Sequence, residues 1–238
     1  MNLSAFWTFS MLSSMANSLQ SEFENIGGQF LSSLTEMQEN IKEIDAFLFD
    51  WDGVFNNGIK SSAQGSPFSE ADSMGINMLR FSYYLLHGKM PYVGIITGEN
   101  NQTAVHFAER EHINAVVLKA KNKGEAIGSF CKAYGLESNQ CLFVFDDILD
   151  ISATLRCKMA LGVRRAASPL FHNYLIEEQI CDYISGNEGG QHAVREICEL
   201  IIGLQGNYQQ TIEARIEFKE EYVNYLRMRQ DIQPSVNS

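Results

Sequence analysis

The sequence predicts an α/β fold in which a mostly parallel sheet carries helices on both faces. Three observations lead to this prediction. Short apolar runs of strand length alternate with stretches of ten to fifteen residues that have helical spacing. Turn-forming residues separate these segments, and no low-complexity linker interrupts them. Hydrophobic residues make up 45% of the 238 residues, which is enough for one sizeable core with appendages.

The charge balance excludes several classes of partner. The formal net charge is −11, which disfavours both nucleic acid and anionic membrane surfaces. An anionic substrate must therefore be attracted by a local device, such as a metal ion, a lysine or backbone amides. The five cysteines are scattered, and none has Cys-x-x-Cys spacing, so we expect reduced thiols and a cytoplasmic location.

The first part of the chain, residues 1–43, is expected to be a helical extension. Its early apolar stretch lacks a basic region before it and is too short to span a bilayer, so a secretory signal is not expected. A helical stripe follows at Phe30, Leu31, Leu34, Met37 and Ile41. This stripe is equally compatible with packing on its own domain and with an oligomer contact.

The alternating elements begin at residue 44. The predicted strands are 44–49, 92–96, 115–118, 142–145 and 159–163, and the predicted helices are 74–87, 102–111, 123–134 and 151–157. Turn signals at Asn57-Gly58 and Gly65-Ser66-Pro67 predict a short hairpin over residues 54–68. Strands that alternate with helices in this way indicate a parallel sheet.

Asp50 and Asp52 follow the first predicted strand and are themselves followed by Gly53. Side chains at positions i and i+2 of an extended chain project to the same side. Ligands of parallel sheets bind beyond the carboxyl ends of the strands. One carboxylate placed there can act as a nucleophile while the other transfers a proton. Alone, however, such a pair is often a solvated turn.

Further polar residues occur in a fixed order downstream. Thr97-Gly98 ends the second strand, Lys123 opens a helix, and Asp146, Asp147 and Asp150 follow the strand at 142–145. A hydroxyl and a lysine can hold phosphoryl oxygens, and clustered carboxylates suit Mg²⁺. Thr-Gly is a common turn, and most lysines are solvated. The order of all the pieces is what favours phosphoryl-transfer chemistry.

Together these motifs resemble those of the haloacid dehalogenase superfamily of phosphatases. Two further segments resemble its capless sugar-acid phosphatases, which act on 3-deoxy-D-manno-octulosonate 8-phosphate or on related nine-carbon keto-acid phosphates. They are residues 68–79, FSEADSMGINML, and residues 189–201, GGQHAVREICELI. The resemblance spans residues 44–204, which we take as the phosphatase domain.

The resemblance implies a Rossmann-like sheet, a hairpin in place of a cap domain and a homotetramer with a role in lipopolysaccharide biosynthesis. It also implies a role for individual residues of this chain. Asp50 would be the nucleophile and Asp52 the acid/base, while Thr97 and Lys123 would bind phosphate. Asp50, the carbonyl of Asp52, Asp146, Asp147 and Asp150 would bind or support Mg²⁺. The substrate contacts would be Asn57, Thr97, Gly98, Glu99 and Lys123.

Several departures from the family pattern leave alternatives open. Glu99 stands where octulosonate phosphatases tend to carry arginine, which raises a nonulosonate 9-phosphate as the substrate. Phe145 and Leu149 replace a glycine and an asparagine beside the acidic residues, which raises a catalytically weak scaffold subunit. In a phospho-receiver module the acidic pair comes first and the phosphorylated aspartate sits alone on a later strand. The order of the motifs in this chain differs, which disfavours such a module.

Residues 205–238 form the last predicted unit. Residues 208–229 are charged and carry Ile212, Ile216, Val223 and Leu226 near helical spacing, which predicts one amphipathic helix. It can pack on its own domain or cross to another subunit of a symmetric oligomer.

Overall fold

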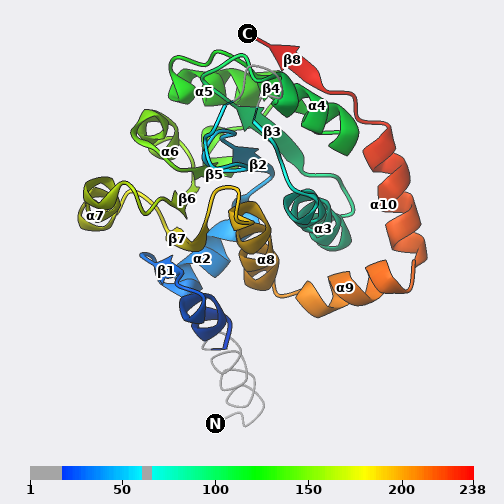
Figure 1. Cartoon of the computed structure of the whole chain (residues 1–238). Coiled ribbons are helices and arrows are strands. Elements are labelled where there is room, and N and C mark those ends of the chain that lie inside the picture. Colours follow the sequence, from blue (N-terminus) through cyan, green and yellow to red (C-terminus); the bar gives the residue numbers. More distant parts are fainter. Residues whose placement is uncertain (1–17, 61–65) are drawn as a thin grey trace, which may run out of the picture.

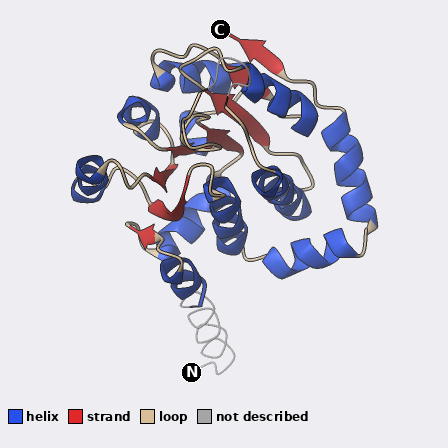
Figure 2. Ribbon diagram, viewed as in Figure 1, coloured by secondary structure: helices blue, strands red, loops and turns tan. Residues whose placement is uncertain are grey.

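The computed structural model describes residues 18–60 and 66–238. A twisted sheet forms its centre, and helices cover both faces (Figures 1 and 2). The strand order is β1-β7-β6-β5-β2-β3-β4-β8. All neighbouring strands are parallel except β1, which is antiparallel to β7. The predicted α/β class is confirmed.

The strand bounds agree with the sequence pattern at the centre of the sheet. The strands are β1 Gln29–Phe30, β2 Ala46–Phe49, β3 Tyr92–Ile96, β4 Ala115–Val117, β5 Cys141–Phe145, β6 Met159–Arg164, β7 Tyr183–Glu188 and β8 Ser235–Asn237. The sequence pattern did not indicate β1, β7 or β8. The two edge strands are very short, and β7 contains Gly186 and Asn187, which disfavour strands.

Most of the helices lie in two layers, one on each face of the sheet (Figure 1). They are α2 Leu34–Asn40, α3 Glu70–His87, α4 Gln102–Glu111, α5 Lys123–Tyr134, α6 Ile151–Thr154, α7 Pro169–Glu177, α8 Ala193–Gln205, α9 Tyr208–Ile216 and α10 Glu220–Gln230, with 3₁₀ turns η1 Ile41–Glu43, η2 Ser138–Gln140 and η3 Ile148–Asp150. Helices α5, α6 and α7 cover one face, and α2, α3, α4 and α8 cover the other. Helices α7 and α8 were not predicted.

The central strands are apolar throughout because both of their faces are buried. In β5, Leu142 and Val144 pack toward the α3 and α8 side, whereas Phe143 and Phe145 pack toward α5 and α6. Buried parallel strands therefore read as continuous apolar runs. Local signals set the helix starts: the side chain of Ser69 caps α3, and that of Asn122 caps α5.

The N-terminal extension differs from the prediction. Residues 18–25 are helical, but Gly27 then adopts a φ of 96°, and Phe30 lies in β1 rather than in a helical stripe. A new helix begins after Ser33, whose side chain accepts a hydrogen bond from the Glu36 amide. The extension packs against β7 of its own chain. Residues 1–17 lie outside the described part of the chain.

The predicted hairpin region has little regular structure where it is described. Over residues 50–60 and 66–69, the turns include a single isolated bridge between Asp52 and Asn56. The rest of the predicted hairpin, residues 61–65, lies outside the described residues. The segment thus leaves β2 in turns and reaches α3 without a ladder among the described residues.

The C-terminal helix is divided in two. Phe218 adopts a left-handed φ of 53° between α9 and α10, which ends the continuous helix predicted for residues 208–229. The position lacks the glycine or proline that would have indicated a break. Tyr222 and Tyr225 of α10 pack on Phe81 of α3, and β8 then pairs with β4. This terminal arm therefore packs on its own chain (Figure 1).

Candidate active site

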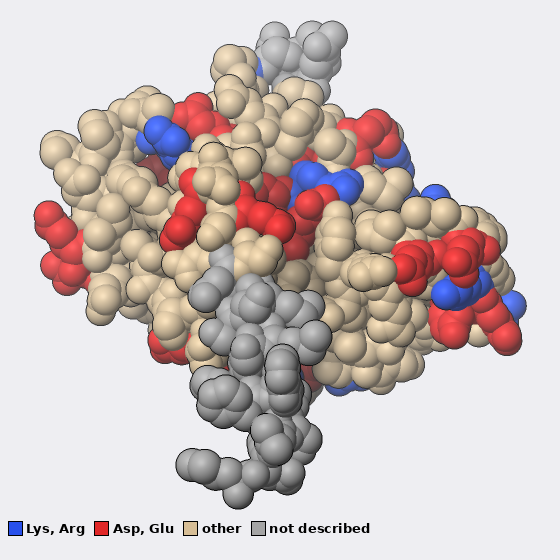
Figure 3. All heavy atoms as spheres, turned by 90° about the horizontal axis from the view of Figure 1, so that it is seen from below, with Lys and Arg blue, Asp and Glu red and all other residues tan. Residues whose placement is uncertain are grey.

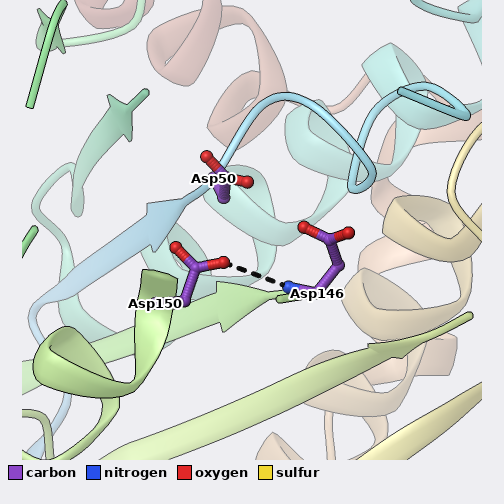
Figure 4. Close-up of side chains that lie close together, drawn as sticks. All are labelled: Asp50, Asp146 and Asp150. Atoms are coloured by element: carbon purple, nitrogen blue, oxygen red, sulfur yellow. Dashed lines mark hydrogen bonds between the residues drawn. The ribbon is translucent and has the colours of Figure 1, made fainter. Parts of the chain in front are cut away.

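Three buried aspartates lie together beyond the carboxyl ends of the central strands (Figure 4). Asp50 follows β2, Asp146 follows β5, and Asp150 ends η3. One carboxylate oxygen from each lies within 4.8 Å of the others. The Asp146 and Asp147 amides donate to Oδ2 of Asp150 at 3.4 and 3.2 Å, which orients that side chain. This donor set fits a hard divalent cation such as Mg²⁺.

Lys123 enters the same cluster from the first turn of α5. Its Nζ lies 2.6 Å from Oδ1 of Asp50 and also pairs with Asp150. Burial favours the neutral amine, but the negative charges of Asp50 and Asp150 outweigh burial and raise the pKa of Lys123. A charged ammonium therefore faces the first aspartate of the Asp-x-Asp motif.

Burial and mutual repulsion disfavour the ionised form of these carboxylates, so a nearby positive charge would stabilise them. Burial first, and then Asp150, raise the pKa of Asp50 well above its ordinary value, although Lys123 opposes this. Burial raises the pKa of Asp146 to about 6, while Arg165 opposes the shift. A bound cation would relieve these carboxylates, so their electrostatics agree with their geometry in favouring a metal site.

The second aspartate of the motif, Asp52, lies in a different set of contacts. Asn101 Nδ2 donates to Oδ2 of Asp52 and to Oγ1 of Thr97, both at 2.7 Å. The Ser66 hydroxyl donates to Oδ1 of Asp52 at 2.7 Å, and Lys60 Nζ lies 3.1 Å from Oδ2. Asp52 and Thr97 thus share one partner beside the acidic cluster.

Trp51, between the two aspartates of the motif, is anchored in the core. Its indole is fully buried and stacks on Phe55 with ring centroids 4.7 Å apart. Phe107 of α4 packs on it at 5.6 Å. The strand β2 ends at Phe49, and the backbone bends at Trp51 and turns from Gly53 rather than continuing as the extended strand that the i, i+2 argument assumed.

The remaining predicted site residues lie at the rim and are exposed. Asp147 accepts a hydrogen bond from the Ile148 amide at 2.7 Å and lies outside the cluster of three carboxylates. Gly98 and Glu99 follow Thr97, whose hydroxyl accepts the Glu99 amide at 3.4 Å. Asn57 accepts the Ile59 amide at 3.1 Å. Their side chains are free to meet a ligand, but these contacts assign them no chemistry.

Sequence reasoning missed Arg165, which pairs with Asp146. It directly follows β6, so the rule that places functional residues after parallel strands would have found it. Asn101 and Ser66 were also missed. They come from loops, and only the tertiary structure brings them to Asp52.

Comparisons with known proteins agree with this geometry. No family model matches the chain. The 3-deoxy-D-manno-octulosonate 8-phosphate phosphatase of Haemophilus influenzae is 24% identical over 174 residues, 71% of this chain and 89% of that protein. The crystal structure of the Moraxella catarrhalis phosphatase of the same name, in complex with a magnesium ion, a phosphate ion and a KDO (3-deoxy-D-manno-octulosonate) molecule, is 26% identical. It matches with a TM-score of 0.63 over 76% of this chain and 98% of its own.

A haloacid dehalogenase superfamily (subfamily III A) hydrolase structure from Legionella pneumophila matches similarly. Its TM-score is 0.63 and its identity is 24%, over 77% of this chain and 95% of its own. This chain has the haloacid dehalogenase fold and resembles the octulosonate phosphatases. The relatives account for about three quarters of this chain, so the chain carries segments beyond the shared fold.

The two bulky departures from the phosphatase pattern leave the acidic cluster clear. Phe145 is fully buried and stacks on Phe143 in the core beneath α5 and α6, whereas Asp146 emerges beyond the strand. Leu149 is 76% exposed in η3. Neither side chain lies among the three carboxylates. Their bulk therefore gives no structural reason for a damaged centre.

Proposed function

We propose that this protein is a Mg²⁺-dependent phosphomonoesterase that hydrolyses a small phosphorylated sugar acid of the octulosonate 8-phosphate type. The observation that carries the proposal is the buried Lys123 between Asp50 and Asp150, with Asp146 beside them. An ammonium and a carboxylate in contact can bind a phosphoryl group and attack it. Asp50, Asp146 and Asp150 would hold the cation, which when bound offsets the repulsion between the carboxylates and the phosphate.

In the proposed reaction, Asp50 attacks phosphorus and forms an aspartyl phosphate as the bond to the sugar oxygen breaks. Asp52 gives its proton to the departing alkoxide. Asp52 then takes a proton from water, the hydroxyl attacks the aspartyl phosphate, and inorganic phosphate leaves with Asp50 restored. Lys123 and Thr97 hold phosphoryl oxygens throughout. Asn101 orients Asp52 toward Thr97 and so keeps the acid beside the phosphoryl site.

The test is phosphate release from octulosonate 8-phosphate with and without Mg²⁺, in the parent and in Asp50→Asn and Asp52→Asn. We expect Mg²⁺-dependent release by the parent and losses of orders of magnitude in both variants. Circular dichroism and thermal unfolding check that the variants are folded. Parent-like rates in Asp50→Asn would refute the nucleophile.

Two other functions have an observation in their favour. Glu99 is exposed at the rim and suits hydroxyls, which favours a nonulosonate 9-phosphate as the substrate. Comparing kcat/KM for the eight- and nine-carbon substrates distinguishes these. Arg165 on Asp146 occupies a carboxylate that a cation needs, which favours a catalytically weak scaffold. Equal phosphate release by the parent and Asp50→Asn would support that alternative.

The remaining proposals concern the setting of the reaction. Residues 44–204 would form the catalytic domain, in a homotetramer that light scattering can test. Within residues 18–60 and 66–238, no helix is both long and apolar enough to cross a membrane. All five cysteines fall in these ranges and are free thiols, which supports the proposed cytoplasmic location.

A further inference from the structure

A cavity of about 240 Å³ opens beside the acidic cluster, where β6 meets α7. Its lining residues are Gly27, Gln29, Arg164, Arg165, Ala166, Pro169, His172 and Ser185. Arg165 belongs to both places, because its guanidinium also pairs with Asp146. The cavity therefore begins one side chain away from the proposed reaction centre, and no step of the proposed reaction uses it.

The cavity is cationic in an otherwise acidic protein. Acidic side chains are spread over much of the face in Figure 3, and the net charge is −11. Arg164 and Arg165 are the one pair of adjacent basic residues in the sequence, and both line the cavity. Pro169 places the positive end of α7 there as well. The nearby acid Glu188 accepts the Ala166 amide at 2.7 Å and is not among the lining residues.

The cavity also contains groups suited to hydroxyls. Burial and the charge of Arg164 lower the pKa of His172, so its imidazole is neutral near pH 7. Gln29 adds an amide from β1. The volume is below the roughly 300 Å³ at the lower end of whole small-molecule sites, so the cavity suits one end of a ligand.

We propose that this cavity binds the carboxylate end of the sugar-phosphate substrate, with Arg164 and Arg165 as its donors. This inference rests on the proposed function. Across the rim the strands run β6-β5-β2-β3, so Arg165 and Glu99 flank the acidic cluster on opposite sides. A substrate whose phosphoryl group sits at Asp50 meets attraction for its carboxylate on the β6 side and repulsion on the β3 side. Two strand spacings, roughly 10 Å, separate β6 from β2, a span suited to a chain of several carbons.

The Arg164→Gln variant tests the inference, because Arg164 is exposed and is not bonded to the acidic cluster. Arg227→Gln, an exposed arginine in the last turn of α10, is the matched control. We expect Arg164→Gln to lower the ratio of kcat/KM for octulosonate 8-phosphate to that for 4-nitrophenyl phosphate at least tenfold, mainly through KM. The control should keep the parent ratio. A parent-like ratio in Arg164→Gln overturns the inference.

Isothermal titration with free octulosonate and with inorganic phosphate separates this inference from the proposed function. We expect the parent to bind octulosonate, and Arg164→Gln to bind it at least tenfold more weakly with phosphate affinity unchanged. Equal weakening for phosphate, or no octulosonate binding by the parent, overturns the inference. Arg164-dependent octulosonate binding without any hydrolysis would overturn the phosphatase and leave the cavity standing. Ala166→Glu, which adds an anion at the exposed edge of the cavity, gives the same readouts should Arg164→Gln fail to fold.

Discussion

Two buried charged clusters in this molecule have opposite characters. At Glu111, where α4 ends, one carboxylate receives bonds from Ser73, Asn77 and Arg229, each at 2.6 Å. At the strand rim, three carboxylates share Lys123 and Arg165. In the first cluster several donors surround a single anion. In the second cluster the anions outnumber the cations.

The difference separates a structural role from a chemical one. The Glu111 cluster ties α10 to α3 and α4, since Arg80 also donates to the Glu111 carbonyl at 2.6 Å. Its single carboxylate is fully paired by the chain itself, although the buried Nε atoms of Arg80 and Arg229 have no hydrogen-bond partner among the described residues. In the rim cluster the carboxyl pKa values are raised, and a bound cation would lower them by stabilising the ionised carboxylates. A buried cluster whose negative charge the chain does not balance favours the binding of a cation.

The largest expected effect comes from Asp50→Asn in the rim cluster. Turnover should fall by about 10³-fold or more, because an amide cannot form the aspartyl phosphate. Stability in the absence of metal should not fall, because the change removes a buried negative charge and leaves Asp150 to pair with Lys123. Steady-state kinetics and urea unfolding measure the two outcomes. Strong destabilisation with retained turnover would mean that the rim cluster is structural and would contradict its proposed catalytic role.

Glu111→Gln should have the opposite profile. Removing the charge leaves Arg229 buried without its anion, so unfolding free energy should fall by about 3 kcal/mol. Turnover per folded molecule at 25 °C should remain, since the cluster touches no proposed site residue. Glu39→Gln, in an exposed pair with Lys42, is the control and should unfold like the parent. A variant as stable as the parent would mean that Glu111 does not fasten the arm.

Asn101→Ala should have an intermediate effect, because it disturbs the position of Asp52 without removing a reacting group. Losing the amide that bridges Asp52 and Thr97 should lower turnover about 10–100-fold. The loss should be larger for alkyl phosphates than for 4-nitrophenyl phosphate, whose leaving group needs little help from an acid. Kinetics on both substrates give the comparison. An equal loss of turnover on the two substrates would mean that Asn101 acts by positioning Thr97 and not by positioning Asp52.

The rim cluster was largely predictable from sequence because its signals are local. Asp50 and Asp146 each follow a buried apolar strand, and Lys123 opens a helix capped by Asn122, so strand topology alone brings them together. Asn101 carries no such motif, and Arg165, although it directly follows β6, does not reveal from sequence which carboxylate it pairs with. Their contacts depend on loop conformations that a single sequence does not reveal.

The same contrast holds for the fold. Strand β3 and helices α4 and α5 have the predicted bounds, since apolar runs and turn residues mark both ends. The break at Phe218 is set by packing, because Phe218 and Arg215 both lie against Tyr222 of α10. The short strands β1 and β8 form only because a neighbouring edge is available to pair with them.

The smallest predicted effect is the stabilisation by Mg²⁺ and its dependence on pH. The pKa of Asp146 is raised to about 6, so the metal-free fold holds this proton more tightly than the unfolded chain does. That contribution to stability is present at low pH and is lost as pH rises from about 4 through about 6. Mg²⁺ requires the ionised carboxylate, so its stabilising effect should grow over the same interval. At ten times its Kd it should reach about 1.4 kcal/mol near pH 7.5 and be much smaller at pH 5.

Thermal unfolding with and without Mg²⁺ at both pH values measures this effect. Asp146→Asn should lose most of the response, whereas Glu111→Gln should keep it despite its lower stability, because the two clusters share no residue. A response that does not change with pH would place the cation elsewhere than on these carboxylates. A response lost in Glu111→Gln would show that the arm and the rim are coupled, and the division between a structural cluster and a metal-binding one would no longer hold.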